Sequence, residues 1–263
     1  MRQAVIRTPA GEAAFDLEEP GDFPSVFVFA MHKSGSTLMD RMLKQALTAA
    51  GVPQMALPTV AFRAGLPNEI LNPEELIFPR GYCYRRFHGF PDYLYPFDIA
   101  RNKKLLLIRD PRDIVVSYYF SMAQSHGLPP VGVVERLLLG IRKKAQSTSI
   151  DQFCQGIAKV FTEEFWTYRP ILSTELRLYR YEDVIFDKKA WLEDMLSYMD
   201  FSLDSATVAR IARENDIWPA VERPSEHIRQ VKPGNFRKHL NRKSIELLNA
   251  EFEPLLTEYN YAF

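Results

Sequence analysis

Short apolar runs alternate with amphipathic stretches along most of this chain. The runs at 26–30 and 105–108 contain only apolar side chains, which is typical of strands buried on both faces of a parallel sheet. Residues 81–90 and 176–181 predict two further strands. Strands separated by helices predict an α/β fold, in which one domain has a central parallel β-sheet flanked by helices. The helices are expected at 38–47, from 111 to the turn at 127–130, and at 131–145, 150–168, 187–199, 204–215 and 242–258.

Two stretches fit neither pattern. Residues 1–22 predict an irregular N-terminal arm, which leaves 23–263 as the folded domain. Residues 53–79 are interrupted by prolines and predict loops with one short helix. A length of 263 residues, 46% of them hydrophobic, suits one α/β domain with a large core.

The first strand and the first helix are joined by the string HKSGST at 32–37, which carries a lysine, a glycine and three hydroxyls. A strand–loop–helix turn points backbone N–H groups at whatever lies on the helix N-terminus, and this geometry favours an anion. Lys33 adds a positive charge. The loop therefore predicts a site for a phosphate or a group of similar shape, bound by Lys33, Ser34, Gly35, Ser36 and Thr37.

A second string, LLLIRDPRDIVVSYYFS at 105–121, has the same strand-to-helix character. Asp110 is a suitable N-cap and Pro111 suits the first helical position. Arg109 lies at the carboxyl end of the strand, where open α/β sheets bind ligands. Ser117 follows Arg109 by eight residues and is placed to face the same site. The alternative is that Arg109 pairs with Asp110 or Asp113 on the surface.

The two strings, in this order, resemble the 5′-phosphosulfate loop and the 3′-phosphate motif of sulfotransferases that use 3′-phosphoadenosine 5′-phosphosulfate (PAPS). A Walker-type loop for nucleoside triphosphates reads GxxxxGK[ST], whereas here Lys33 precedes the glycine. The resemblance implies a P-loop nucleotide-kinase-like fold, PAPS as co-substrate and adenosine 3′,5′-bisphosphate (PAP) as product. Two alternatives stay open: a small-molecule kinase and a non-catalytic nucleotide-binding module.

Two further strings resemble the same family. LYRYEDV at 178–184 is similar to the strand end whose tyrosine lies near the adenine, a position matched by Tyr181. IRQVKPGNFRKHL at 228–240 is similar to the loop that closes over the 3′-phosphate, with Arg229 and Gly234 matching. Lys232 is a candidate for the lysine that this loop otherwise lacks. At Leu38 many members have a tryptophan that stacks on adenine. The other departures are Gln230, Val231, Asn235 and Phe236.

Sulfuryl transfer needs a cation near the leaving oxygen and a base for the acceptor hydroxyl. Lys33 is placed for the first role. The resemblance assigns the second to His88, at the end of the strand before the Arg109 strand, and Arg86 is placed to meet the sulfuryl oxygens. His32 occupies a position that is often proline in the family. A carboxylate base is the alternative, and the candidates are Glu69, Glu74 and Glu75.

Composition narrows the function further. The chain has 33 basic and 33 acidic residues, and this zero formal charge argues against a nucleic-acid binder. Cys83 and Cys154 are the only cysteines and form no CxxC pair, which favours a reducing cytoplasm and argues against a disulfide scaffold or a zinc site. No bound metal is expected. No signal peptide and no membrane span are expected. The expected acceptor is a hydroxyl on a small molecule, lipid or carbohydrate, and the oligomeric state stays open.

Overall fold

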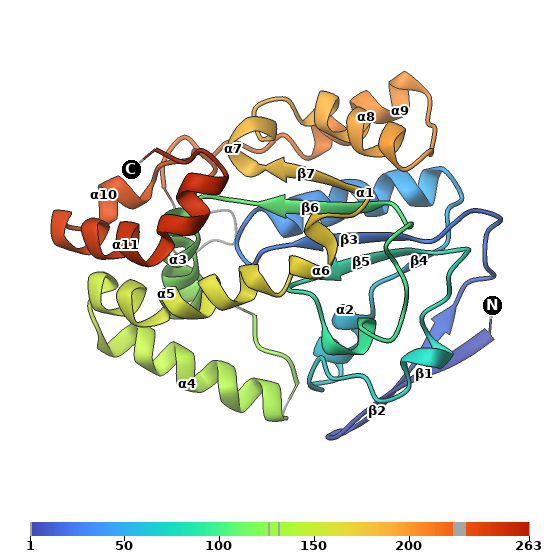
Figure 1. The fold of residues 1–263 in the computed structure, drawn as a ribbon, viewed down its shortest axis with the longest axis horizontal. Helices are drawn as coiled ribbons and strands as arrows, with labels where there is room; N and C mark the ends of the chain where they lie inside the picture. The colour runs from blue at the N-terminus through green and yellow to red at the C-terminus, as the bar shows by residue number, and fades with distance from the viewer. Residues whose placement is uncertain (1, 126, 131, 223–229, 263) are drawn as a thin grey trace.

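The computed structural model of the protein describes residues 2–125, 127–130, 132–222 and 230–262. A five-stranded sheet runs through its middle in the order β4-β5-β3-β6-β7, and every neighbouring pair is parallel (Figure 1). The strands are β3 (Val26–Ala30), β4 (Gln54–Met55), β5 (Cys83–Phe87), β6 (Lys104–Ile108) and β7 (Leu176–Arg180). The predicted α/β architecture with a central parallel sheet is confirmed.

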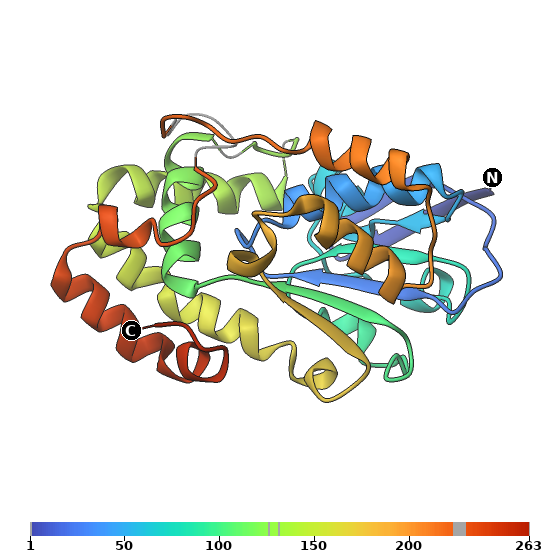
Figure 2. The same ribbon diagram turned by 90° about the horizontal axis from the view of Figure 1, so that it is seen from above.

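Helices cover both faces of the sheet (Figure 2). One layer consists of α1 (Ser36–Ala49), α8 (Lys188–Tyr198) and α9 (Ser205–Glu214). The opposite layer contains α2 (Leu57–Arg63), α3 (Pro111–Phe120), α5 (Ile150–Trp166) and α11 (Arg242–Glu258). The remaining helices are α4 (Val133–Ser147), α6 (Arg169–Leu172), α7 (Tyr181–Val184) and α10 (Phe236–His239). Apart from the helix that begins at Pro111, the long predicted helices are confirmed, with ends shifted by a few residues.

The strand sequence explains why two helical layers form. Val26 and Val28 of β3 pack against the α1 layer, whereas Phe27 and Phe29 pack against the α5 layer. Every residue of β3 and of β6 is buried. Apolar side chains therefore point from the sheet in both directions, and each face must be covered by helices.

The structure corrects the prediction for the N-terminal residues. Instead of an irregular arm, β1 (Arg2–Thr8) and β2 (Gly11–Leu17) form an antiparallel hairpin. Ile6 and Leu17 are buried in the core of the α5 layer. The polar residues that alternate with them face outward, and this alternation is weak because the apolar members include three alanines.

A second correction concerns the helix that begins at Pro111. It was expected to continue to the turn at 127–130, but α3 ends at Phe120 and the chain continues as a π-helical turn over Ser121–Ser125. Turns of this kind often occur at functional sites. Ser121 accepts a hydrogen bond of 3.0 Å from the ammonium group of Lys33, so the turn bears directly on the loop after β3.

Candidate active site

The loop that joins β3 to α1 turns tightly at the carboxyl end of the sheet. Lys33 (φ 61°) and Gly35 (φ 97°) both have left-handed backbone conformations. No described side chain caps the N-terminus of α1, and its first turn contains no acidic residue. Backbone N–H groups and the positive end of the helix dipole therefore face the space in front of the loop, where an anion is favoured.

The loop residues divide into those that face this space and one that does not. Ser34 is fully buried, and its hydroxyl donates a 2.6 Å hydrogen bond to the carbonyl oxygen of Met31. The hydroxyl of Ser34 therefore stabilises the turn itself. The other predicted loop residues line a cavity in front of α1, namely Lys33, Gly35, Ser36 and Thr37.

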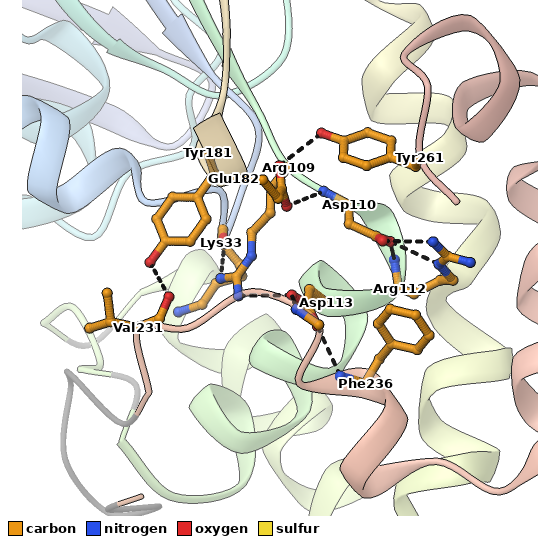
Figure 3. Close-up of polar contacts among 11 residues, drawn as sticks. Lys33, Arg109, Asp110, Arg112, Asp113, Tyr181, Glu182, Val231, Phe236 and Tyr261 are labelled. Carbon is orange, nitrogen blue, oxygen red and sulfur yellow. Dashed lines mark hydrogen bonds and ion pairs between the residues drawn. The ribbon is translucent and has the colours of Figure 1, made fainter. Parts of the chain in front are cut away.

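Arg109 reaches the same cavity from the end of β6. Its Nη1 donates to the carbonyl oxygen of Lys33 at 3.3 Å, and its Nη2 donates to Asp113 at 3.2 Å (Figure 3). The alternative to an anion-binding role was a surface pair with Asp110 or Asp113. Arg109 does pair with Asp113, but it is only 7% exposed, so the pair is buried. Its Nε is buried and has no hydrogen-bond partner among the described residues. A buried donor without a partner costs free energy, so Arg109 is prepared for an acceptor that enters the cavity.

Asp113 and Tyr181 attach the closing loop to this arginine. The carboxylate of Asp113 accepts hydrogen bonds from the backbone N–H groups of Gly234 (2.7 Å) and Phe236 (2.9 Å). The hydroxyl of Tyr181 donates to the carbonyl oxygen of Val231 at 2.7 Å (Figure 3). The sequence suggested that this loop covers the site, and the described part of it lies there.

The cavity between these elements has a volume of about 150 Å³. It brings both predicted anion motifs together, since Ser117 and Tyr181 line it beside Arg109 and the loop residues. Gln230 and Val231, two departures from the family pattern, also line it. Lys232 is exposed and is not among the lining residues. Arg229 lies outside the described residues.

Beyond Leu38, which the sequence marked as the position of a tryptophan in many family members, sequence reasoning missed the far end of the cavity. The missed residues are Arg41, Ile185, Lys188, Asn215 and Ile217. Arg41 donates to the side chain of Asn215, and the buried ammonium group of Lys188 donates to Asp216 at 2.6 Å. None of these residues belongs to a recognisable string, so only the packing of α1, α8 and the segment after α9 reveals them.

His88 lies just beyond the end of β5, beside the loop after β3. Arg86 has φ 71°, and the pairing of β3 with β5 is irregular between Phe27 and Phe29. Such a bulge turns the following side chains. The Nδ1 of His88 lies 2.9 Å from the carbonyl oxygen of Ala30. A carbonyl can only accept, so Nδ1 carries the proton and Nε2 keeps the lone pair that a base needs.

Burial lowers the pKa of His88 well below its ordinary value, and the nearby His32, Arg86 and Lys33 lower it further. The imidazole is therefore neutral near pH 7 and able to accept a proton. The predicted role of Arg86 finds less support, because its guanidinium lies 3.5 Å from Asp40 on α1. Neither Arg86 nor His88 is among the residues that line the cavity. Asp40 also pairs with Arg85.

The carboxylates proposed as alternative bases lie elsewhere. Glu75 pairs with Arg7 of the hairpin at 2.7 Å, and Glu74 is its neighbour in the same 3₁₀ turn. Glu69 is exposed on the loop before that turn. The carboxylate that does lie beside the histidines is Glu164 of α5, which accepts hydrogen bonds from His32.

Glu164, His32 and His88 offer potential ligand atoms within 4.8 Å of one another. However, the two imidazoles are stacked, with centroids 4.2 Å apart and planes at 23°. Lone pairs lie in the plane of each ring, so stacked rings direct them side by side and not at one ion. The Nδ1 atoms of both rings are also engaged in hydrogen bonds. The cluster is arranged for hydrogen bonding.

Gly35 allows a close approach that no other residue permits. A Cβ at this position would lie 2.8 Å from two ring carbons of Tyr181. Gly35→Ala is therefore expected to weaken PAP binding at least about tenfold, because the ring must move, and to destabilise the fold by about 1–3 kcal/mol. Gly51→Ala is the matched control, since its φ is also positive but nothing lies within 4 Å. Equal losses in the two variants would show that only backbone strain matters. Calorimetric titration and thermal unfolding measure both effects.

Comparisons with known proteins agree with this geometry. Residues 23–260 match the family model described as the sulfotransferase domain. The chain therefore belongs to the sulfotransferase domain family, a class of enzymes that transfer sulfuryl groups. A search of curated protein sequences finds no match.

Within the described residues, no helix combines the length and the apolar character that crossing a membrane requires.

Two solved structures share the fold at low sequence identity. Mouse sulfotransferase SULT7A1 complexed with PAP has a TM-score of 0.58 and 13% identity, over 92% of this chain and 90% of that one. Retinol dehydratase in a complex with retinol and PAP has a TM-score of 0.53 and 15% identity, over 93% of this chain and 84% of that one. This agreement supports the P-loop nucleotide-kinase-like architecture.

Proposed function

We propose that the protein transfers the sulfuryl group of PAPS to the hydroxyl of a small-molecule, lipid or carbohydrate acceptor. The observation that carries this proposal is the shared cavity, which is lined both by the loop before α1 and by Arg109 with its unpartnered Nε. PAPS and PAP carry a 5′-phosphate and a 3′-phosphate on one adenosine. Two anion sites joined by one cavity suit such a ligand.

Each end of the cavity has a distinct role in this proposal. The loop and the N-terminus of α1 bind the phosphosulfate, with Lys33 neutralising the charge that develops on the leaving phosphate. Arg109 and Ser117 bind the 3′-phosphate, and the closing loop at 230–236 covers it. The apolar side chains at the far end, Leu38, Ile185 and Ile217, pack against the adenine.

His88 is the proposed base. As the acceptor oxygen forms its bond to sulfur, its O–H bond breaks and the proton passes to Nε2 of His88. The bond between sulfur and the bridging oxygen breaks, and its electron pair goes to the leaving phosphate of PAP. The protein mainly positions these groups and stabilises charge, by analogy with phosphoryl transfer.

The acceptor and the cellular location belong to the same proposal. Retinol dehydratase, a structural neighbour, was solved with retinol bound, which is consistent with a small hydroxylated acceptor here. A cytoplasmic location rests on the two cysteines, both buried and unpaired. The balanced net charge continues to argue against nucleic acid as a partner.

Ligand preference separates this proposal from a small-molecule kinase. Calorimetric titration in the presence of a chelator should show tight binding of PAP and much weaker binding of ATP. The reason is that Arg109 gains a partner only from a ligand with a 3′-phosphate. Tighter binding of ATP than of PAP would contradict the proposal.

Arg109→Ala tests the 3′-phosphate site. Loss of a charge-assisted contact should weaken PAP binding by about 1.5–3 kcal/mol, or roughly ten- to a hundredfold. The decisive quantity is the ratio of affinities for PAP and adenosine 5′-monophosphate, which should fall in the variant. Arg101→Ala, an exposed arginine on the loop before β6, should leave the ratio unchanged. If Arg109→Ala also leaves it unchanged, the 3′-phosphate is bound elsewhere, with Arg229 as the next candidate.

A further inference from the structure

Glu164 contacts the site through His32 and has no role in the mechanism above. Its two carboxylate oxygens accept hydrogen bonds from the backbone N–H of His32 (2.9 Å) and from Nδ1 of the same residue (2.9 Å). The side chain of Glu164 is only 12% exposed. No lysine or arginine of the described chain forms an ion pair with it. The carboxylate is thus nearly buried and directed entirely at His32.

His32 in turn lies face to face with His88. The ring centroids are 4.2 Å apart, and the planes are nearly parallel at 23°. Since Nδ1 of His32 donates to Glu164 and Nδ1 of His88 donates to Ala30, each ring is held by a fixed acceptor. The orientation of the His88 ring therefore depends on a partner that Glu164 keeps in place.

The end of α5 holds the His88 loop by a second set of contacts. The backbone N–H of Gly89 donates to the hydroxyl of Tyr168 at 2.8 Å. The backbone N–H of Phe90 donates to Thr167 Oγ1 at 2.8 Å. Glu164, Thr167 and Tyr168 are spaced at i, i+3 and i+4, so one face of this helix end contacts both the loop after β3 and the loop after β5.

The charges of the groups around His88 indicate a second role for Glu164. The groups placed against His88 are His32 and Lys33 from the loop after β3, Arg86 from β5 and Glu164 from α5. Tyr118 of α3 and Tyr168 lie near Glu164 and are neutral phenols in this pH range. Glu164 is thus the carboxylate in this group, and the other charged side chains oppose a positive charge on His88.

We propose that Glu164 is a positioning residue for the base. It holds His32 against His88 and balances the positive charge that the stacked rings gain when His88 takes the proton of the acceptor hydroxyl. This inference rests on the proposed function, because it assigns a partner to the base of that reaction. The acceptor O–H bond breaks, the proton moves to Nε2 of His88, and Glu164 keeps its own charge throughout.

Glu164→Gln is the main test. In glutamine an NH₂ donor replaces one of the two carboxylate oxygens, so the two hydrogen bonds that His32 makes to separate oxygens of Glu164 cannot both be kept. We expect kcat to fall by at least about tenfold, and the acidic limb of the rate profile to move to lower pH by roughly one unit, because a compensating negative charge is lost. PAP affinity should not change. Glu163→Gln, an exposed neighbour that pairs only loosely with Lys159, is the matched control and should behave as wild type.

Two more variants separate positioning from simple structural support. Glu164→Asp keeps the charge and should restore most of the shift in the pH profile. If Glu164 acts through His32, the double variant Glu164→Gln with His32→Asn should lose no more activity than the worse single variant. Additive losses, an unmoved pH limb, or a parallel loss of PAP binding would each overturn the inference.

A readout that needs no turnover distinguishes this inference from the proposed function. NMR titration of the imidazole C–H signals in the PAP complex should give a lower midpoint for His88 in Glu164→Gln than in wild type. An unchanged midpoint would overturn the role of Glu164. The midpoint of His88 can also shift while the wild-type protein sulfonates no acceptor. In that case the proposed function is wrong, but the effect of the Glu164 charge on the pKa of His88 is confirmed.

Discussion

Lys33→Ala is expected to lower the rate of sulfuryl transfer by roughly three decades or more, since it removes the cation at the developing charge. The N-terminus of α1 and Arg109 remain, so PAP should still bind, although more weakly. Stability should change little because Lys33 lies on a loop and is partly exposed. Single-turnover rates with PAPS, together with thermal unfolding, measure both quantities.

Lys44→Ala provides the control for this prediction. Lys44 is an exposed residue in the middle of α1, and its replacement should leave the rate unchanged. A Lys33→Ala variant that keeps a near wild-type rate would show that the loop before α1 does not hold the sulfuryl group.

His88→Asn is expected to lower kcat by roughly two to four decades with PAP affinity nearly unchanged. Asparagine can still donate to the carbonyl oxygen of Ala30, as Nδ1 of His88 does, but it cannot accept the proton of an alcohol. Near wild-type turnover in this variant, combined with an inactive Glu164→Gln variant, would assign the base to a carboxylate.

The dependence of the rate on pH tests the same role of His88, and its direction follows from the pKa of this residue. A histidine base with an ordinary pKa would give a rate that rises through an ionisation near pH 6.5. The structure lowers the pKa of His88 well below that value, mainly by burial. A base must be neutral, so the rate should rise with pH through a midpoint below about 6.5 and be flat near neutrality. This limb should be absent in His88→Asn.

The strands β3 and β6 could be predicted because residues 26–30 and 105–108 are continuous apolar runs. Helices cover both faces of β3 and β6, so every residue of these strands is buried and nearly all of them are apolar. The hairpin β1–β2 lies outside the main sheet and has only one side on the core. Its sequence therefore alternates weakly, and the small apolar side chains at Ala4, Ala13 and Ala14 gave no strand signal.

The two anion motifs could be predicted because their residues are contiguous and follow strand ends. Arg109, Ser117 and Tyr181 meet the loop before α1 as expected. The partners of the motifs could not be predicted. Glu164 is one polar residue on an amphipathic helix, and nothing in its neighbourhood along the chain distinguishes it from Glu163. Only the packing of α5 against two strand-end loops makes that distinction.

The same reasoning applies to the far end of the cavity. Lys188 follows the helical pattern of α8, and Asn215 ends α9, so both read as ordinary helix residues. Asn215 contacts Arg41, and Lys188 lines the same cavity, because α9 packs against both α1 and α8. Such contacts join residues that are far apart in the sequence. The periodicity of apolar and polar positions along one helix does not reveal which other helix it will contact.

The central claim is that PAPS, and not ATP, is the donor for transfer to a hydroxyl. It is tested most directly by incubating the protein with PAPS or ATP and a panel of hydroxylated acceptors, with products identified by mass spectrometry. We predict that PAPS gives a sulfonated acceptor together with one equivalent of PAP, and that ATP gives no product. A phosphorylated acceptor formed from ATP, or bound PAP with no acceptor sulfonated across the panel, would contradict the account.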